Sequence, residues 1–570
     1  MEGSKSIKKI RKNNSEGKEW LQQLTSQSGQ KTGSRPKVMN IATEFYKDLY
    51  TRQNRDEIDT ALNRNEDNNT FQLPPILDSE VHKAIKELKN GKCPGSDGIT
   101  NEILKTVSEE ISEPLSKIFS NIMETTVIPN DWNISEIVLL HKKGPKDNIA
   151  NYRPISLMSV IYKLFTKIIL NRIKNILDEN QPPDQAGFRA GYSTMDHLFV
   201  VNQVIEKYNE YNKKLYIAFV DFNKAFDMVE HKSLMNALHQ QGVPKPYIDI
   251  LEKIYDSSIG KIKLEKVGPP FRLERGVRQG DPISPKLFTA LLEQVFRNID
   301  WDEHMGININ GKTLSNLRFA DDIALFAENH EDIQRMLQHL SKESEKVGLK
   351  INESKTKIMT NNTREETKLN DKIIEYVEDY CYLGQTVSFL KHQDKEIKIR
   401  IGNAWKQYWS LSFILKGDFS MKIKRDVMNM CILPVLTYGT ETLALTKEQN
   451  RKLKVCQRRM ERSILGISLR DRIRNTEIRR RTGVKDVGEE VWMKKWQWAG
   501  HVARMNPEKW TKLCYEWYPR DGVRRAGRPT TRWRDSLHKA VGPLWTHEAQ
   551  SREHWKFLGE ALAPDGDVAG

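Results

Sequence analysis

Two stretches of the chain place carboxylates directly beside apolar runs. Asp321 and Asp322 lie inside an apolar run from Leu317 to Phe326. The run is short enough for two strands of a buried hairpin with the Asp-Asp pair at the tight turn, where aspartate tolerates unusual backbone angles. Ionised carboxylates are costly there unless a cation binds them, and Mg²⁺ prefers one or two carboxylates plus substrate phosphates. A polar hairpin tip on the protein surface is the alternative interpretation.

The second carboxylate is Asp221, which ends a predicted strand from Leu215 to Val220. The nearby Asp227 invites comparison with a calcium-binding loop. That interpretation fails because Phe226 occupies the sixth position, where the loop needs glycine, and no glutamate closes it at the twelfth. What remains is a carboxylate at the end of a buried strand. Phe226 either packs in the interior or forms a wall against a sugar hydroxyl.

Basic residues follow a third apolar segment. The predicted strand from Ile137 to Leu140 runs into Lys142 and Lys143, and Arg153 comes ten residues later, before a predicted helix with Leu157, Ile161, Leu164 and Ile168 on one face. A triphosphate needs positive partners from several directions, so these three residues are candidates to bind one. A solvated, basic strand edge is the alternative.

Three glycine-containing loops complete the set of candidates. The loop from Glu274 to Pro285 precedes a predicted helix, Leu287 to Phe296, and would present Gln279 and backbone amides beside Gly280 at a cleft. The segment from Gln185 to Ser193 suits contact with a nucleic-acid backbone, or is an ordinary surface loop. The loop from Asn90 to Gly98 has three glycines but lacks the Gly-Lys-Ser/Thr ending of a nucleoside-triphosphatase loop.

Composition sets the wider frame. A chain of 570 residues is too long for one core, so about three or four structural units are expected. The formal charge of +15 favours a polyanionic partner. No apolar run is long enough to cross a bilayer, so no membrane partner and an intracellular location are expected. The cysteines form no Cys-x-x-Cys pair and are expected to be reduced thiols: Cys93, Cys381, Cys431, Cys456 and Cys514.

The predicted elements that carry these loops are mostly helical. Residues 1 to about 35 are polar and basic and predict a disordered leader, in which the cluster Lys8 to Lys12 is a nuclear address or a solvated charge run. A polar loop is expected from Asn63 to Asn69. Helices are predicted from their apolar stripes at Val38–Tyr50 (Ile41, Phe45, Leu49), Val81–Leu88, Ile333–Leu340 and, as a mainly helical region, Ile399–Leu445.

The C-terminal part of the chain concentrates charge and tryptophan. Residues 451–540 hold 25 Lys and Arg against 10 Asp and Glu, an excess equal to the formal charge of the whole chain. Interleaved basic and aromatic residues suit phosphate contact and base stacking. The alternative is a small Trp-rich core with a basic exterior, and both can hold together. The tryptophans concerned are Trp492, Trp496, Trp498, Trp510, Trp517, Trp533, Trp545 and Trp555.

Taken in order, these segments resemble the reverse transcriptase of a non-LTR retrotransposon across about residues 80–385. The resemblance rests on GKCPGSDGIT, NYRPISL, QAGFRAGYST, VDFNKAFDMV, RGVRQGDPISPKLF, FADD, GLKINESKTK and YCYLG. It implies an α+β right-hand polymerase, with fingers and a palm of antiparallel sheet plus helices (76–390), and a helical thumb (391–470). A basic leader and helical linker (1–75) would precede them, and a basic, Trp-rich nucleic-acid-binding region (471–570) would follow.

The resemblance also implies roles for single residues. Asp221, Asp321 and Asp322 would form the catalytic carboxylate triad and, with the Phe222 carbonyl, bind two Mg²⁺ ions about 4 Å apart, with Mn²⁺ as an alternative ion. Nucleotide binding would fall to Lys142 or Lys143, Arg153, Phe222, Phe226 (excluding the ribose 2′ hydroxyl), Gln279 and Gly280. Lys355 would protonate the leaving group, although spacing does not decide between it and Lys357. Primer contact would fall to Tyr382, Leu383 and Gly384.

The expected partners are an RNA template, a DNA primer or nicked target DNA, and deoxynucleoside triphosphates, with a nuclear site of action; the oligomeric state is left open. Full-length elements of this kind usually carry an endonuclease domain, and the residues before Asn90 are too few for one. A truncated copy, a partial gene model or reliance on a nick made elsewhere is therefore expected. A catalytically silent, nucleic-acid-binding remnant is the rival interpretation.

Overall fold

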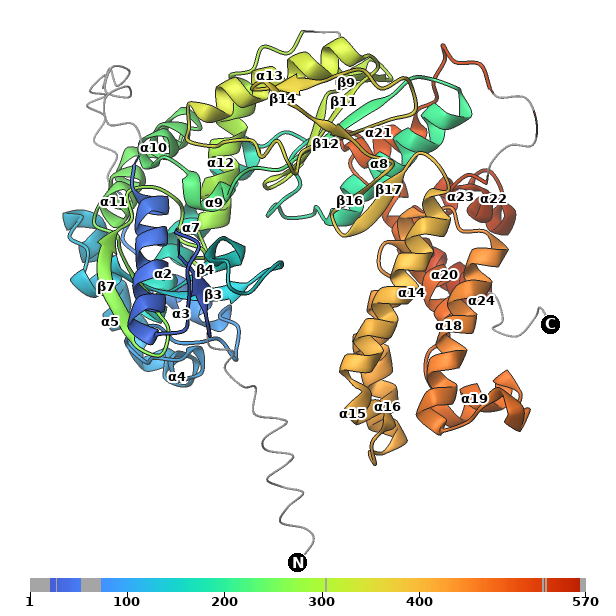
Figure 1. Cartoon of the computed structure of the whole chain (residues 1–570), viewed down its shortest axis with the longest axis horizontal. Helices are drawn as coiled ribbons and strands as arrows, with labels where there is room; N and C mark the ends of the chain where they lie inside the picture. The colour runs from blue at the N-terminus through green and yellow to red at the C-terminus, as the bar shows by residue number, and fades with distance from the viewer. Residues whose placement is uncertain are drawn as a thin grey trace, which may run out of the picture. The chain divides into compact units, whose positions relative to one another are not determined.

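The computed structural model describes residues 21–26, 28–52, 73–302, 305–524, 527 and 531–563 (Figure 1). The chain divides into two compact units that each draw on several segments. Unit 1 contains Met1–Gln181, Asn223–Asn298 and Glu343–Lys350, and unit 2 contains Pro182–Phe222, Ile299–Lys342 and Ile351–Gly570. The fold is mixed, with helices and strands in both units.

Unit 1 is built on a four-stranded sheet. Strand β3 (Ile134–His141) pairs antiparallel with β4 (Tyr152–Leu157) and parallel with β6 (Ile259–Lys263), and β7 (Val267–Arg272) closes the order β4-β3-β6-β7. The predicted strand at Ile137 is therefore confirmed. Leu157 lies in β4 and not in the following helix α7 (Val160–Glu179), which corrects the predicted start of that helix.

Helix α2 (Arg35–Tyr50) packs against β7, as Figure 1 shows. The predicted helix is confirmed, but its predicted face is wrong. Val38, Ala42 and Tyr46 are fully buried, whereas the stripe predicted from Ile41, Phe45 and Leu49 is only partly buried. The small Ala42 side chain lets the helix approach the sheet along the stripe that carries Tyr46, whose hydroxyl donates to the Tyr152 carbonyl at 3.1 Å.

The residues just before α2 are ordered, contrary to the predicted leader. A two-stranded ribbon, β1 (Leu24–Thr25) and β2 (Lys31–Thr32), precedes the helix. Leu21 and Leu24 are buried in the same core as α2, because they cover apolar surface that the helix leaves open. The basic cluster Lys8–Lys12 and the polar loop Asn63–Asn69 lie outside the described residues.

The other helices of unit 1 surround this sheet and the loop after β7. The glycine-rich loop 90–98 has a structural explanation, since a Cβ on Gly95 would lie 2.5 Å from the Met158 carbonyl. The predicted helices at Val81 and Leu287 are confirmed as α3 and α12. The helices are α3 (Asp78–Lys86), α4 (Asn101–Thr106), α5 (Ser108–Thr125), α6 (Asn130–Asn133), η1 (Ile149–Asn151), α9 (Ala225–Met228), α10 (His231–Gln240), α11 (Lys245–Asp256) and α12 (Ser284–Arg297).

Unit 2 contains a five-stranded sheet in the order β10-β11-β5-β12-β15. Its strands are β10 (Asn316–Phe319), β11 (Asp322–Ala327), β5 (Tyr216–Val220), β12 (Lys357–Thr360) and β15 (Glu375–Tyr376). All five residues of β5 are buried, so the strand lies at the centre of the sheet with both faces covered. Helix α8 (Thr194–Glu210) shares a core with Ile217, Phe219 and Phe326 of this sheet. Helix α13 (His330–Glu345) follows β11 and confirms the helix predicted from Ile333 to Leu340.

The remaining strands of unit 2 form two-stranded ribbons. They pair β8 with β9, β13 with β14, and β16 with β17. Their bounds are β8 (Ile307–Ile309), β9 (Lys312–Leu314), β13 (Lys368–Leu369), β14 (Lys372–Ile373), β16 (Asp379–Tyr382) and β17 (Gln385–Ser388).

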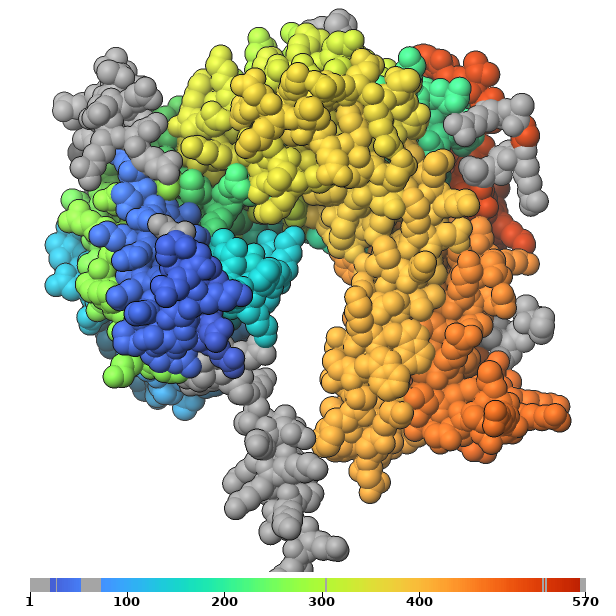
Figure 2. All heavy atoms as spheres, in the orientation of Figure 1, coloured from blue at the N-terminus to red at the C-terminus, as the bar shows by residue number. Residues whose placement is uncertain are grey.

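The region predicted as mainly helical from Ile399 to Leu445 is helical. The sequence predicts that Trp405, Tyr408, Trp409 and Leu411 form the apolar part of this region, and the packing corrects this expectation. Only Tyr408 is fully buried, and Trp409 is 54% exposed. Trp405 and Leu411 are partly buried against the same core. The helices are α14 (His392–Ser410), α15 (Ser412–Lys416), α16 (Met421–Val427), the π-helix η2 (Met428–Ile432), α17 (Leu433–Leu436) and the 3₁₀-helix η3 (Thr440–Thr442). In Figure 2 these helices are the column of yellow and light orange spheres.

The C-terminal tryptophans form cores and are not an exposed stacking surface. Trp496 stacks on Trp555, with ring centroids 4.0 Å apart, in a buried cluster that also contains Trp498, Trp533 and Trp545. Trp510 and Trp517 are buried in the core of α8 and the five-stranded sheet, and Trp492 is partly buried. Base stacking on these buried indoles is therefore excluded. The helices concerned are α18 (Lys447–Leu465), η4 (Leu469–Asp471), α19 (Asn475–Thr482), α20 (Val487–Ala503), α21 (Trp510–Glu516), α22 (Asp535–Val541), α23 (Trp545–Glu548) and α24 (Arg552–Ala561).

All five cysteines are free thiols, as predicted. Across the part of the chain that the structure describes, none of the helices is both long and apolar enough to cross a lipid bilayer.

Candidate active site

Asp221 directly follows β5, at the end of the central strand of the five-stranded sheet. Val220 pairs with Ile323 of β11, so the next step of this antiparallel register sets Asp221 beside Asp322. The Asp221 carbonyl accepts a hydrogen bond from the Asn352 amide at 2.7 Å, which fixes the backbone beyond the strand. The Asp221 side chain is 31% exposed. Two residues that are a hundred positions apart in the sequence are thus neighbours.

The hairpin that carries Asp321 is a two-residue turn. Phe319 pairs with Asp322, which leaves Ala320 and Asp321 as the loop. The predicted hairpin is confirmed, but the unusual backbone angle falls on Ala320, at φ +57°, and not on an aspartate. Asp322 is the first residue of β11 and is exposed. Alanine in the left-handed region is strained, so neighbouring groups must hold the turn.

The segment that begins at Gln185 holds this turn. The Gln185 side-chain oxygen accepts hydrogen bonds from the amides of Gly187, at 2.8 Å, and Ala320, at 3.2 Å. A Cβ on Gly187 would lie 2.4 Å from the Ala320 nitrogen, so only glycine fits there. The sequence analysis missed this positioning role. No local pattern links Gln185 to a residue 135 positions later.

Lys355 binds the first carboxylate directly. Its Nζ lies 3.0 Å from Asp221 Oδ2, and its side chain is 47% exposed. Lys357, the alternative in the sequence, instead donates to Glu375 at 2.7 Å and to the Ser354 carbonyl at 2.6 Å. The geometry therefore brings Lys355 to the carboxylates and leaves Lys357 at the β12–β15 edge.

The donor set at this edge suits a hard divalent cation. Among the residues that the structure describes, no group of three His, Cys, Asp or Glu side chains gathers closely enough to hold a metal ion without help. Mg²⁺ needs fewer protein ligands, since it takes one or two carboxylates and completes its shell with water and substrate phosphates. Asp221, Asp321 and the Phe222 carbonyl are all oxygen donors. Phe222 forms a β-bridge with Ile351, and the two hydrogen bonds of this bridge are accepted by the carbonyls of Asp221 and Lys350. The Phe222 carbonyl accepts neither of them. The residues therefore fit a substrate-assisted magnesium site.

The β16–β17 hairpin lies against the same strands. The Tyr380 ring stacks on Phe219 of β5, with centroids 4.3 Å apart and an interplanar angle of 7°. Burial, together with the nearby charges of Asp221 and Asp322, raises the pKa of Tyr380 to about 12. Tyr380 is therefore a neutral phenol near the carboxylates. The sequence analysis assigned it no role of its own.

The predicted primer-contacting residues form the tip of this hairpin. Leu383 and Gly384 both have positive φ, +46° and +80°, as a tight two-residue turn requires. Their carbonyls are bound from the helical region, Leu383 by the Tyr438 hydroxyl at 2.7 Å and Gly384 by Arg400 at 2.6 Å. Tyr382 is buried, so the part of this tip that a ligand can reach is the turn.

In unit 1, the predicted triphosphate-binding residues meet at one end of two paired strands. Arg153 lies opposite Leu140 in the β3–β4 register, and the Lys142 amide donates to the Asn151 carbonyl at 2.9 Å just beyond it. The side chains of Lys142, Lys143 and Arg153 are all exposed. The strand pairing thus gathers the three cations on one rim.

Gln279 and Phe226 belong to a second group in unit 1, around the buried Asp227. Asp227 Oδ1 accepts hydrogen bonds from Gln279 Nε2 at 3.0 Å and from the Tyr50 hydroxyl at 2.9 Å. Burial raises the pKa of Asp227 to about 6, although Tyr50, Lys224, Gln279 and Arg153 lower it. The Phe226 ring stacks on Phe288 with centroids 4.3 Å apart and is half-buried, so it both packs and presents a surface.

The loop that carries Gln279 is held by two buried charges that the sequence analysis did not single out. Arg278 donates to the carbonyls of Trp132 and Ile254, and Asp281 accepts from Thr166 at 2.8 Å. Gly280, at φ +117°, would place a Cβ 2.8 Å from the Ser156 carbonyl. The loop is thus locked against β4, which fixes Gln279. The carboxylates and Lys355 belong to unit 2, whereas Gln279 and the basic rim belong to unit 1.

Comparison with known proteins identifies the family of this chain. The family described as "Reverse transcriptase (RNA-dependent DNA polymerase)" matches residues 140–387, which contain all of the sites above. A transposon-derived protein of Caenorhabditis elegans is 32% identical over 268 residues, which are 44% of this chain and 96% of that protein. The chain belongs to the reverse transcriptase family.

Other matches connect this reverse transcriptase to non-LTR retrotransposons. A probable RNA-directed DNA polymerase from transposon BS of Drosophila melanogaster is 25% identical over 442 residues, 74% of this chain and 48% of that protein. The chain thus spans about half the length of this relative. An apo telomerase of Candida tropicalis has a TM-score of 0.36 at 13% identity, over 71% of this chain and 74% of that one, a likeness too low to assign the arrangement of the parts. Family membership implies binding of a nucleic-acid template and primer.

Proposed function

We propose that this reverse transcriptase is an RNA-directed DNA polymerase that extends a DNA primer, or the 3′ end of nicked target DNA, on an RNA template in the nucleus. The observation that carries the proposal is the end of the five-stranded sheet. The β5–β11 register sets Asp221 beside Asp322, and Asp321 occupies the adjoining turn. An edge with this concentration of negative charge suits a divalent cation and a phosphate-bearing substrate.

Each unit would supply a different part of the reaction. In unit 2, Asp221, Asp321, Asp322 and the Phe222 carbonyl would hold two Mg²⁺ ions, for which Mn²⁺ can substitute. When bound, the ions lower the pKa of the primer hydroxyl and neutralise charge on the leaving pyrophosphate. Lys355, with its ammonium 3.0 Å from Asp221, would deliver a proton to that leaving group. The Leu383–Gly384 turn would contact the primer, and the buried Tyr382 would support that turn from the interior.

Unit 1 would bind and select the nucleotide. Lys142, Lys143 and Arg153 share one exposed rim and would bind the triphosphate of a deoxynucleotide. Gln279 and Gly280 would line the nascent base pair from a loop that Arg278 and Asp281 hold rigid. Phe226 would close the space beside the sugar 2′ carbon, since stacking on Phe288 fixes its ring.

Primer extension on an RNA template with Mg²⁺ tests the proposal. We expect the wild-type chain to extend a labelled DNA primer and Asp321→Ala to lose about a thousandfold in rate, because the lost stabilisation is worth several kcal/mol. The wild-type and variant chains should bind the template equally. If the wild-type chain binds RNA but does not extend the primer, while a known polymerase does so alongside it, the chain is a silent nucleic-acid-binding remnant.

A further inference from the structure

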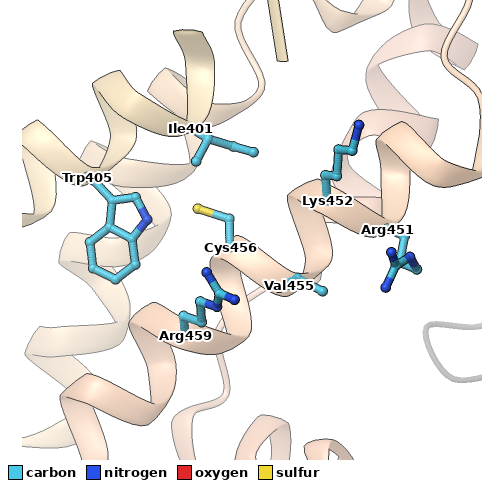
Figure 3. A pocket seen from close by; sticks show the side chains of 7 residues that line it. All are labelled: Ile401, Trp405, Arg451, Lys452, Val455, Cys456 and Arg459. Carbon is cyan, nitrogen blue, oxygen red and sulfur yellow. The ribbon is translucent and has the colours of Figure 1, made fainter. Parts of the chain in front are cut away.

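A pocket of about 350 Å³ lies between helices α14 and α18, outside every site described above. Figure 3 shows that Ile401 and Trp405 come from one helix and that the other lining side chains come from the second. The lining combines an apolar wall with three cationic side chains. The residues are Ile401, Trp405, Arg451, Lys452, Val455, Cys456 and Arg459.

The apolar wall is fixed by Trp405 and Cys456. Burial raises the pKa of the Cys456 thiol to about 11, and a hydrogen bond from the Trp405 indole and the charge of Arg459 both counter this rise. Trp405, Cys456 and Arg459 all line the same pocket. Val455 is 39% exposed, although it is apolar. The pocket thus offers an open apolar surface beside an aromatic ring.

The cationic side of the pocket is not neutralised. In the described parts of the chain Arg459 makes no ion pair, whereas the adjacent Arg458 is buried against Glu461 and Asp486. Arg451 and Lys452 pair only with exposed acids, Glu448 at 2.9 Å and Asp394 at 3.4 Å, and such pairs are weak. Helix α18 carries seven basic residues and two acidic ones. The pocket therefore attracts an anion.

The aromatic surface continues beyond the pocket. Trp409, one turn along α14, stacks on Trp405 with centroids 6.1 Å apart and an interplanar angle of 25°. It is 54% exposed, and Lys416 Nζ lies 5.3 Å from its ring centroid. An exposed tryptophan beside a lysine has the composition of a stacking platform for a nucleic-acid strand.

We propose that this α14–α18 pocket binds one unpaired nucleotide of a single-stranded nucleic acid, with its neighbour on Trp409. A nucleotide combines a flat aromatic base for Trp405 with a phosphate for Arg459, which are the two features that the lining provides. The volume admits one nucleotide but not a base-paired duplex. A purely apolar ligand would make no use of the cationic side of the pocket, and an acidic peptide would leave the aromatic wall unused.

This inference goes beyond the proposed polymerisation, because it concerns binding away from the carboxylates. It is tested by the fluorescence anisotropy of short labelled oligonucleotides of uridine or deoxythymidine, and of a duplex, with the full chain. The assay contains no nucleoside triphosphate, so a chain that fails to extend a primer can still bind. The two single strands distinguish RNA from DNA as the ligand.

Arg459→Ala should weaken single-strand binding about tenfold, because it removes a phosphate contact. The matched control is Arg470→Ala, which removes the same charge from an exposed arginine outside the pocket and should change binding less than about twofold. Trp405→Phe should keep binding and Trp405→Leu should lose it, although both remove the indole. Arg459→Ala and Arg470→Ala should change binding of the duplex to the same extent.

A 5-iodouridine oligonucleotide, cross-linked by light and mapped by mass spectrometry, locates the base. Cross-links to Trp405 or Trp409 support the proposal. Equal effects of Arg459→Ala and Arg470→Ala, or cross-links confined to other residues, overturn it. Light scattering tests whether a second copy of the chain occupies the pocket instead. If Arg459→Glu abolishes self-association and leaves oligonucleotide binding intact, a second copy is the occupant and the proposal fails.

Discussion

Unit 2 contains two groups of paired acidic and basic side chains that are built in opposite ways. At the end of β5, Asp221 and Lys355 form an ion pair whose side chains are 31% and 47% exposed. Between α18 and α20, Arg458 binds Glu461 and Asp486, whose side chains are fully buried. Burial raises the pKa of Glu461, against the lowering effect of Arg458 and its hydrogen bonds.

The contrast separates acids that can exchange partners from acids that cannot. Asp486 also caps α20 by accepting hydrogen bonds from the Gly488 and Glu489 amides, so its oxygens are committed to the fold. Asp221 has a flexible lysine as its ionic partner, at a strand end that water reaches. A cation can replace that lysine without unfolding the chain. We therefore expect the first group to affect catalysis and the second to affect stability.

Arg458→Met should show the largest effect on stability. It leaves Glu461 and Asp486 buried without their cation, and breaking such a pair costs about 3–5 kcal/mol. Urea unfolding followed by circular dichroism measures the loss, and the rate of primer extension per folded molecule should not change. Arg459→Met, one residue along on the exposed face, is the control and should stay within about 0.5 kcal/mol of wild type. If both variants lose the same free energy of unfolding, the buried arginine and the exposed arginine contribute equally to stability, contrary to this prediction.

Lys355→Ala should slow primer extension about a hundredfold, as expected for removal of a general acid. The same change should lower the Mg²⁺ concentration needed for half-maximal rate, since the ammonium no longer competes for Asp221. Lys357→Ala is the matched control and should leave both quantities within about twofold of wild type, because its partner is Glu375. A magnesium dependence that Lys355→Ala leaves unchanged would count against this competition.

Gly187→Ala should have an intermediate effect that links packing to catalysis. The added methyl would lie 2.4 Å from the Ala320 nitrogen, and overpacking of this kind costs about 1–3 kcal/mol. Because Ala320 precedes Asp321 in the turn, the rate of primer extension should fall together with the free energy of unfolding. Gly402→Ala on α14, where nothing lies within 4 Å of the new Cβ, should instead stabilise the chain by about 0.5–1 kcal/mol. A Gly187→Ala chain with wild-type rate would show that the turn needs no support.

Asp227→Asn should have the smallest effect, and it depends on pH. The folded-state pKa of Asp227 is raised from 3.8 to about 6, so its contribution to stability is fully present below about pH 4 and is lost as the pH rises through 6. Both hydrogen bonds go to Oδ1, which asparagine retains. Relative to wild type, the variant should therefore gain on the order of 1 kcal/mol between pH 5 and 7, measured by urea unfolding. A difference that does not vary with pH would show that Asp227 titrates as an exposed acid.

The sequence predicted the carboxylate edge because each part of it is local. An apolar run interrupted by Asp321 and Asp322 can only be buried as two strands, and Asp221 follows a run of buried residues directly. What the sequence could not supply is the support. The strained backbone of Ala320 is held by a hydrogen bond to Gln185, which lies 135 residues earlier. No repeating pattern in the sequence indicates a contact between two residues so far apart.

The same limit applies to the aromatic residues. Tyr408 and Trp409 are adjacent in one helix, and their types alone predict burial for both, yet one is buried and the other is 54% exposed. Which side of α14 faces its neighbours is decided by the position of α17 and α18, not by hydrophobicity. The tryptophans near the C-terminus show the opposite outcome. Their basic neighbours in the sequence suggested an exposed binding surface, yet these residues form a core.

The place of Trp510 and Trp517 in the core of the five-stranded sheet has a consequence for synthesis on the ribosome. Strand β11 ends at Ala327, and Trp517 is translated 190 residues later. At about 5–20 residues per second, this interval lasts about 10 to 40 s. For that time the nascent sheet and α8 lack part of their apolar cover. The order of translation therefore makes the carboxylate-bearing sheet one of the last parts of the chain to become complete.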